Sequence, residues 1–237
     1  MQMDLVRAGK KTPPPNAAEV WIDFDGTLTT QDVVDSLVRG FCATDAWRAL
    51  EDAWQAGQIG SRECLAGQFS LVRIGEEDLD AFLASISLDP GTPRLFELLG
   101  RHGVPAMILS DGIDWFIDYI LRAHDLQPPP VRSNTLVRSG ASWQLVCPHF
   151  SPACQSAAAH CKCASMERLG TPGRWRIYVG DGRSDLCAAR KAHLRFAKGT
   201  LAANLEDEGL EYAPFATLND VCHVLETAWP QRRLRAA

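Results

Sequence analysis

The feature that most limits the fold of this chain is a regular alternation of short apolar runs with segments of helical spacing. The apolar runs lie at residues 20–25, 104–110, 176–181 and 194–198. Short runs of this kind are typical of buried strands. Helical spacing is found between them, at residues 93–101, 115–123 and 184–192. This order predicts an α/β fold, a Rossmann-like parallel sheet with helices on both faces.

One long stretch after the first apolar run breaks the alternation. Only helical patterns occur there, at residues 33–41, 45–55, 62–74 and 76–86. The stretch ends at the turn sequence Asp89, Pro90 and Gly91, which suits a hinge. We therefore predict a helical unit over 33–87, inserted after the first strand of a core formed by 20–32 and 88–237.

Two smaller regions also stand apart from the core pattern. After three prolines at 128–130, the segments 135–137 and 143–146 flank residues 138–141 like the strands of a hairpin. This predicts a small excursion over 131–160. Residues 1–19 contain lysines and three consecutive prolines but no apolar stretch, so we expect a disordered tail rather than a signal peptide or membrane anchor.

Composition excludes several classes of protein. With 46% hydrophobic and 22% charged residues in 237, the chain has the make-up of a soluble globular protein. Its net charge of -5 offers no basic surface for nucleic acid or an anionic membrane. No segment has the roughly 18 uncharged apolar residues of a spanning helix. The eight cysteines fit free thiols in a reducing compartment better than a disulfide framework, so we expect a cytoplasmic protein. We also expect a monomer or homodimer.

Acidic residues follow three of the four predicted strands. The first run ends in Asp23 and Asp25, which strand alternation places on the same side. The second is followed by Ser110, Asp111 and Gly112, and the third by Asp181 and Asp185. Ligands of open parallel sheets bind outside the carboxyl ends of the strands. We therefore expect these residues to meet at one edge of the sheet.

A cluster of carboxylates repels itself unless a cation compensates it, and hard oxygen ligands favour Mg²⁺. Asp23, Asp181 and, less directly, Asp185 are the candidate ligands, together with the carbonyl oxygen of Asp25. A carboxylate beside a metal is suited to attack phosphorus, which makes Asp23 the candidate nucleophile. Asp25 would relay protons between the leaving group and water. The Ser110 hydroxyl and the amides of Asp111 and Gly112 would bind phosphate oxygens.

These motifs resemble those of the haloacid dehalogenase superfamily. The sequence DFDGTLT, from Asp23 to Thr29, is similar to its first motif, Ser110 to the second, and GDGRSD, from Gly180 to Asp185, to the fourth. Lys162 is the best match to the lysine of the remaining motif. The resemblance implies that Lys162 contacts the phosphate, that Asp185 is a water-mediated metal ligand or a partner of this lysine, and that the helical insert is a cap.

The residues around the nucleophile narrow the resemblance further. Dehalogenases lack an acid at the position of Asp25, and the transport ATPases have threonine there. The helical cap resembles the phosphoserine phosphatase-like branch, and within it the methionine-salvage phosphatases. Asp111 and Lys198 depart from the residues usual in that group. We therefore expect a phosphatase acting on a small phosphorylated metabolite, such as the enol phosphate of methionine salvage.

Other functions remain open at this point. Phosphoserine phosphatase fits less well because Gln68 occupies the cap position where that enzyme has an arginine, although Asp32, otherwise a helix N-cap, could supply its acid. A phosphotransferase or mutase shares the aspartate pair. A non-catalytic phospho-ligand-binding protein would lack the nucleophile, the acid or the metal ligand.

A cluster of cysteine and histidine residues raises the question of a zinc site. Its spacing lacks two short-spaced ligand pairs, so free thiols are favoured over zinc. The cluster consists of Cys147, His149, Cys154, His160, Cys161 and Cys163. Trp47 and Trp54 are expected to pack within the cap, and Arg183 to be an exposed turn residue.

Overall fold

The computed structural model describes residues 1–140 and 142–229, and within them a single seven-stranded sheet organises the molecule. Its order is β4-β3-β2-β1-β5-β6-β7, and every neighbouring pair is parallel except β3 with β4. The predicted parallel α/β sheet is therefore confirmed. The strands are β1 (Ala18–Ile22), β2 (Ala106–Ile113), β3 (Val131–Ser139), β4 (Ser142–Val146), β5 (Trp175–Gly180), β6 (Leu194–Ala197) and β7 (Ala213–Pro214).

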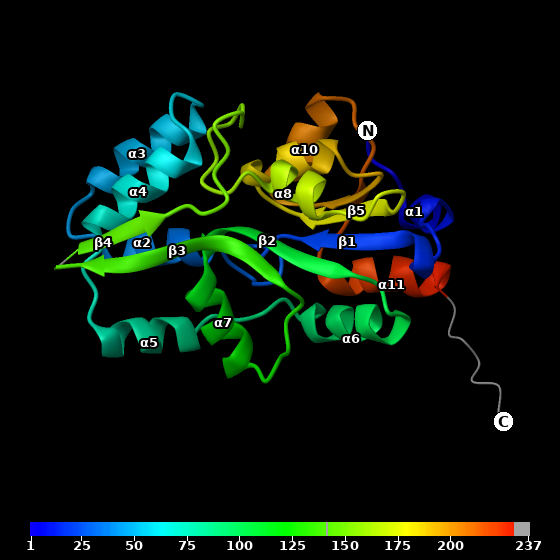
Figure 1. Cartoon of the computed structure of the whole chain (residues 1–237), viewed down its shortest axis with the longest axis horizontal. Coiled ribbons are helices and arrows are strands. Elements are labelled where there is room, and N and C mark those ends of the chain that lie inside the picture. Colours follow the sequence, from blue (N-terminus) through cyan, green and yellow to red (C-terminus); the bar gives the residue numbers. More distant parts are fainter. Residues whose placement is uncertain (141, 230–237) are drawn as a thin grey trace.

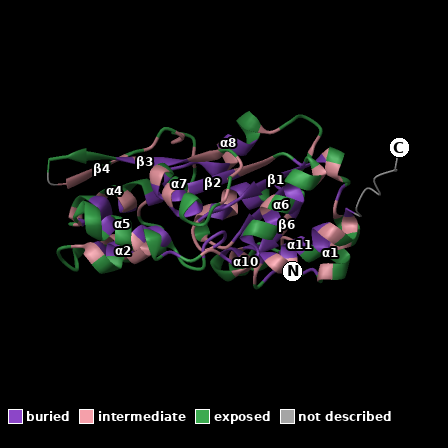
Figure 2. Ribbon diagram, turned by 90° about the horizontal axis from the view of Figure 1, so that it is seen from below, coloured by how far each residue is buried: buried purple, intermediate pink, exposed green. Residues whose placement is uncertain are grey.

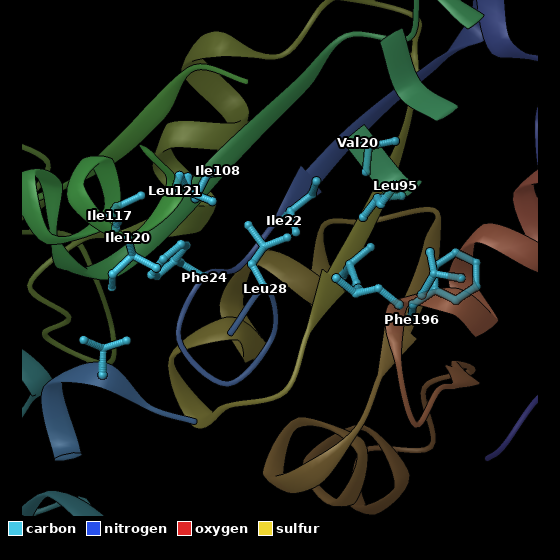
Figure 3. Close-up of a cluster of buried hydrophobic side chains, with 14 of the residues drawn as sticks. Val20, Ile22, Phe24, Leu28, Leu95, Ile108, Ile117, Ile120, Leu121 and Phe196 are labelled. Atoms are coloured by element: carbon cyan, nitrogen blue, oxygen red, sulfur yellow. The ribbon is translucent and has the colours of Figure 1, made fainter. Parts of the chain in front are cut away.

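Helices cover both faces of the sheet (Figure 1). One face carries α8 (Lys162–Leu169), α9 (Leu186–Arg190) and α10 (Gly199–Asp207); the other carries α6 (Thr92–His102), α7 (Asp114–Ala123) and α11 (Leu218–Ala228). The alternation of side chains along β1 explains why two cores form. Val20 and Ile22 pack in one core with Leu95 of α6 (Figure 3), whereas Trp21 belongs to the second core, under α8 to α10.

The cap lies at one end of the molecule, on the side toward which β1 runs (Figure 1). It consists of α2 (Val33–Phe41), α3 (Ala46–Gln55), α4 (Ser61–Leu71) and α5 (Glu76–Ala84), which lie at the four predicted positions. The two chain segments that lead into and out of the cap run side by side. Thr30 N donates to Ser87 O at 3.0 Å and Asp89 N donates to Leu28 O at 2.8 Å.

The prediction of a disordered tail over residues 1–19 is wrong. Residues Leu5–Lys11 form helix α1, Pro15–Ala17 form a 3₁₀ turn (η1), and β1 already begins at Ala18. Asp4 caps α1 by accepting a hydrogen bond from the amide of Arg7 at 2.5 Å. Ala8 is fully buried in the core that also contains α11. The few apolar residues of this segment therefore suffice, because α11 provides the surface that they cover.

The predicted hairpin is a continuation of the main sheet rather than a separate excursion. The first part of β3 pairs with β2 in parallel, and its second part pairs with β4 in antiparallel fashion. Residue 141 of the predicted turn lies outside the described residues. The predicted helix at 184–192 is also modified, because it begins with the 3₁₀ turn η2 (Arg183–Asp185) before α9. The register of β2 against β3 shifts between Leu109 and Ile113, next to the predicted site.

Burial follows this architecture (Figure 2), with buried residues concentrated in the strands and on the inner sides of the helices. In the described part of the chain, the helices are all too short or too polar to cross a bilayer.

Candidate active site

The loop after β1 places Asp23 and Asp25 at the carboxyl edge of the sheet. Asp23 N donates to Val179 O of β5 at 2.9 Å, which continues the strand pairing by one residue. Phe24, between the two aspartates, points into the hydrophobic core (Figure 3). Because neighbouring side chains of an extended segment alternate, Asp23 and Asp25 are directed away from that core, and Asp23 lies near the acids of the loop after β5.

Asp181 of that loop approaches the first loop closely. Gly26 has a φ of 72°, and a Cβ atom at this position would collide with the carboxylate of Asp181. Thr27 Oγ1 donates to Asp181 Oδ1 at 2.8 Å. The predicted meeting of distant acids is thus present: one carboxylate oxygen each of Asp23, Asp181 and Asp185 lie within 4.8 Å of one another.

Lys162 lies between two of these carboxylates. Its Nζ donates to Asp23 Oδ1 at 2.5 Å and to Asp185 Oδ1 at 2.6 Å. Lys162 is fully buried, unlike an ordinary surface lysine. Burial alone would lower the pKa of Lys162, but the carboxylates of Asp185 and Asp23 outweigh it and hold the pKa well above its ordinary value. The lysine is therefore a fixed cation in the site.

Asp185 is held by four hydrogen-bond donors. Besides Lys162, Tyr178 Oη donates to its Oδ1 at 2.6 Å, and the amides of Asp181 and Gly182 donate to its Oδ2 at 3.1 and 2.9 Å. With both oxygens engaged in this way, Asp185 orients Lys162 and the loop after β5. This geometry matches the expected partnership with the lysine more closely than direct ligation of a metal.

Asp25 is anchored by the cap and by β2. The amide of Val33, the first residue of α2, donates to its Oδ1 at 3.2 Å, and Ser110 Oγ donates to its Oδ2 at 2.9 Å. The amide of Gly112 donates to Ser110 Oγ at 2.8 Å. Burial raises the pKa of Asp25, although the hydrogen bond from Ser110 opposes this rise. Asp25 is therefore a carboxyl group that retains a proton at higher pH than an ordinary aspartate.

The side chain of Asp111 serves as a joint between cap and core. Its Oδ2 accepts a hydrogen bond of 2.6 Å from Ser61 Oγ, on the first turn of α4, and its Oδ1 accepts one of 2.6 Å from the amide of His160. Ser61 Oγ also accepts from the amide of Ala159 at 3.0 Å. Asp111, which we predicted to contact phosphate through its amide, thus has an additional structural task that its sequence position did not indicate.

The residues present fit a divalent cation. The candidate donors are hard carboxylate oxygens, which are the ligands that Mg²⁺ prefers. Burial and the nearby Asp185 raise the pKa of Asp23 and raise that of Asp181 to about 6, so the ionised carboxylates destabilise one another despite Lys162. A cation between Asp23 and Asp181 would relieve this repulsion.

Comparison with known proteins identifies the family. The family model described as Putative Phosphatase matches residues 19–196. The chain belongs to this phosphatase family. It is 30% identical over 210 residues to a 2-hydroxy-3-keto-5-methylthiopentenyl-1-phosphate phosphatase of Geobacillus kaustophilus (strain HTA426), covering 87% of this chain and 94% of the relative. A protein of the same name from Brevibacillus brevis (strain 47 / JCM 6285 / NBRC 100599) is 29% identical, with the same coverage.

Solved structures share the fold of this phosphatase. A structure titled as a phospho-aspartyl intermediate analogue of phosphoserine phosphatase has a TM-score of 0.66 at 17% identity, covering 87% of this chain and 97% of its own. A haloacid dehalogenase family hydrolase of Salmonella enterica has a TM-score of 0.69 at 18% identity, covering 93% of this chain and 73% of its own. The likeness to these structures confirms the fold that the resemblance to the haloacid dehalogenase superfamily implies.

The aspartates of this phosphatase open into a cavity of about 300 Å³ between core and cap. Its core wall includes Asp23, Asp25 and Asp181, and its cap wall is formed by residues of α2, α3 and α4. Arg183 is an exposed turn residue, as expected, but it also lines this cavity and donates to Gln55 O at the end of α3 at 2.6 Å. It is a second joint between cap and core.

The two cap tryptophans differ in role. Trp47 is buried, as predicted, beneath the guanidinium groups of Arg39 and Arg48. Trp54 is only half-buried and lines the cavity. Asp32 caps α2 by accepting from the amide of Asp35 at 2.8 Å and also lines the cavity.

The cysteine and histidine cluster lies beside the site, in the chain segment that leads to Lys162. Cys161 Sγ and Cys163 Sγ are 3.5 Å apart, and the structure has all eight cysteines as free thiols. Both ring nitrogens of His160 are engaged, with Ser110 O at 3.0 Å and Ser165 Oγ at 2.8 Å. Within 1–140 and 142–229, the aspartate trio is the only group of three or more potential ligands that converge. Free thiols rather than zinc remain our prediction.

Four contributors to the site escaped the sequence analysis. Thr27 and Tyr178 fix Asp181 and Asp185, while Ser61 and His160 hold Asp111. Thr27 lies inside the DFDGTLT motif, which is a signal that could have identified it. The other three are ordinary residues whose partners lie 7, 50 and 49 positions away, and no local pattern marks them.

Proposed function

We propose that this phosphatase hydrolyses a small phosphate monoester through a covalent phospho-aspartate on Asp23, with Mg²⁺ as cofactor. The observation that carries the proposal is the position of the Asp23 carboxylate, which is held by Lys162 at 2.5 Å at the floor of a cavity that Asp25 and Asp181 also line. A nucleophile, a proton relay and a fixed cation thus face the same space.

In the first half of the reaction, a carboxylate oxygen of Asp23 attacks phosphorus and the ester P–O bond breaks. Asp25 gives its proton to the departing alkoxide, a role that its raised pKa supports. Lys162 keeps Asp23 oriented and offsets the charge that nucleophile and phosphate bring together. The Ser110 hydroxyl, which donates to Asp25 in this structure, and the Gly112 amide, which donates to Ser110, would redirect to the phosphate oxygens beside the amide of Asp111.

In the second half, Asp25, now ionised, removes a proton from water, which attacks the same phosphorus atom. The bond between phosphorus and Asp23 breaks, and the carboxylate is restored as inorganic phosphate forms. Mg²⁺ would be held by Asp23, Asp181 and the carbonyl oxygen of Asp25, with Asp185 acting through water, and would neutralise charge on the phosphoryl oxygens.

We infer that the substrate is a small phosphorylated metabolite, with the enol phosphate of methionine salvage as the first candidate. Its support is the name shared by the relatives from Geobacillus kaustophilus and Brevibacillus brevis. We place the protein in the cytoplasm, since its cysteines are free thiols.

Phosphoserine phosphatase is the second candidate, favoured by the likeness to solved structures of that enzyme. Gln68 argues against this candidate, because it occupies the cap position where phosphoserine phosphatase has a carboxylate-binding arginine. Gln68 lines the cavity and donates to Glu51 at 3.1 Å. Transfer of the phosphoryl group to a second metabolite, or phospho-ligand binding without turnover, are the remaining alternatives.

The test combines 4-nitrophenyl phosphate, with and without Mg²⁺, and a panel of phosphorylated metabolites that includes the enol phosphate and L-phosphoserine. Phosphate release that requires Mg²⁺ and is abolished by Asp23→Asn in a folded protein supports the proposal. Binding of a phosphorylated metabolite without phosphate release would support a phospho-ligand-binding protein without catalytic activity. Rapid turnover of L-phosphoserine would support phosphoserine phosphatase.

A further inference from the structure

We propose that Glu51 selects the leaving group, so that the cap half of the cavity accepts phosphate monoesters of alcohols that carry hydroxyl or ammonium donors and no carboxylate. This inference rests on the proposed function and specifies its substrate class. Glu51 is on α3, in the cap wall of the cavity whose core wall carries Asp23 and Asp25. A leaving group on a phosphate at Asp23 would extend toward this wall.

Neutral donors hold the Glu51 carboxylate in place. Gln55 Nε2 donates to its Oε1 at 2.9 Å, and Gln68 Nε2 donates to its Oε2 at 3.1 Å. Cys64 Sγ is a third, weaker donor at 4.0 Å. A carboxylate has about four acceptor sites, so these contacts orient Glu51 without saturating it. It remains able to accept a hydrogen bond from a bound ligand.

Within the described residues, Glu51 has no ion-pair partner. Arg39, on the same cavity wall, donates from Nε to both carboxylate oxygens of Asp35, at 2.8 and 2.7 Å, and its guanidinium lies 5.4 Å from the ring centre of Trp47. Arg183, the other cavity-lining arginine, donates to Gln55 O. Both arginines thus make their hydrogen bonds to partners other than Glu51, and Arg39 acts on Glu51 only through a weaker electrostatic attraction than the one it has with Asp35.

The charges of the cap residues that line the cavity also disfavour a leaving group with a carboxylate. Burial raises the pKa of Asp32 to about 8, which leaves Asp35 and Glu51 as two ionised carboxylates, against Arg39 as the one cationic side chain among the cap residues that line the cavity in the described chain. A leaving group with a carboxylate would therefore meet a cap wall of net negative charge, while the guanidinium of Arg183, on the core wall, is held by Gln55 O. Hydroxyl or ammonium groups would instead donate to Glu51, and Val34 and Leu65 supply apolar surface to the same cavity.

A matched series of two-carbon substrates tests the proposal. Phosphate release from 2-aminoethyl phosphate, 2-hydroxyethyl phosphate and phosphoglycolate is measured as kcat/KM with Mg²⁺. We expect the wild type to prefer each of the first two over phosphoglycolate by about tenfold or more, because one unfavourable charge contact changes binding by this order. Glu51→Gln keeps the side-chain shape, and we expect it to reduce the preference for 2-aminoethyl phosphate over phosphoglycolate by about tenfold.

The control is Asp52→Asn, which removes the same charge from the next residue of α3, an exposed position away from the cavity. It should leave the preference unchanged. Glu51→Ala, as a second variant, should shift the preference in the same direction as Glu51→Gln. Wild-type preference for phosphoglycolate, or equal shifts in the Glu51 and Asp52 variants, would overturn the role of Glu51 alone. A wild type that fails to hydrolyse even 4-nitrophenyl phosphate overturns the proposed function as well.

Discussion

Lys162 donates a hydrogen bond of 2.5 Å to Asp23, although 139 positions separate the two residues in the sequence. Both side chains are almost inaccessible, at 1% and 5% exposure, and Asp185, on the other side of the lysine, is fully buried. A buried lysine between two carboxylates is stable only as a unit, since removing one member leaves the others uncompensated. The stability of the fold and the chemistry of the site therefore depend on the same ion cluster.

Replacement of Lys162 by methionine should affect stability and activity together. We expect Lys162→Met to lose about 3–5 kcal/mol of unfolding free energy, as is typical when one partner of a buried ion pair is removed. Phosphatase activity should fall by about a thousandfold or more, since the phosphate would lose its fixed cation. Urea denaturation and steady-state kinetics measure the two effects.

The matched control for that variant is Lys191→Met. Lys191 pairs with Glu167 at 2.9 Å, with both side chains about half exposed, so its loss should leave the unfolding free energy almost unchanged. The double variant Lys162→Met with Asp185→Asn should regain part of the lost stability but none of the activity. Equal effects of the two lysine variants would contradict the account.

Removal of the Ser110 hydroxyl should shift the pH dependence of the first reaction step. Ser110 donates to Asp25 and thereby lowers the pKa of that group, against burial, which raises it. Ser110→Ala should therefore raise the pKa of Asp25 further, because a hydrogen bond that favours the ionised carboxylate is lost. Because Asp25 acts as an acid in its protonated form, the alkaline decline of kcat should move to higher pH. An alkyl phosphate must be used, since 4-nitrophenolate leaves without a proton; a shift to lower pH would rule out this role.

Magnesium should stabilise the protein more at neutral than at acidic pH. Burial and Asp185 raise the pKa of Asp181 from 3.8 to about 6, so the metal-free folded state gains stability from protonation, and this gain is lost as the pH rises through about 6. The ionised carboxylate above that pH is the form that binds a cation. The increase in Tm on adding Mg²⁺ should thus be larger at about pH 7.5 than at about pH 5.

Asp181→Asn should remove most of this pH-dependent increase in Tm, whereas Asp207→Asn, at an exposed position near the end of α10, should retain it. Scanning fluorimetry of the three proteins makes the comparison. The same gain at both pH values in the wild type would mean that Asp181 is not a ligand.

The contact between Ser61 and Asp111 should keep the cap docked on the core. Ser61→Ala removes the hydrogen bond of 2.6 Å to Asp111 and leaves the amide of Ala159 unpaired, a loss of about 1–3 kcal/mol in docking. We expect a several-fold higher KM and faster proteolysis within the cap. Ser70→Ala, on the exposed side of the same helix, serves as control. Identical KM and proteolysis in both variants would show that this contact does not hold the cap.

The core of the fold could be predicted because strand and helix differ in the period of their apolar residues. The runs at 20–25 and 176–181 correspond to β1 and β5 within a few residues, and the acids that end them meet at one edge, as the topology of a parallel sheet requires. Helix α1 was missed because its helical signal is short and polar, and its burial depends on α11, more than two hundred residues away.

The sequence was a better guide to which residues form the site than to which side chains bond to one another. Asp111 was identified as a site residue, but its bonds to Ser61 and His160 depend on how the cap and the cysteine-rich segment settle on the core. Lys162 was found only through family resemblance, since nothing in its neighbours indicates burial beside Asp23. Helices α8, α10 and α11 likewise lacked a pattern that we recognised, because packing against the sheet rather than spacing alone defines their buried faces.

Chemical trapping of the intermediate tests the central claim most directly. The protein is mixed with Mg²⁺ and substrate, quenched during turnover and reduced with borohydride, which converts an aspartyl phosphate to homoserine, and the modified residue is located by peptide mass spectrometry. The account predicts homoserine at position 23, dependent on substrate and absent from Asp23→Asn. Continued phosphate release with Asp23 unmodified, or homoserine at a different aspartate, would contradict it.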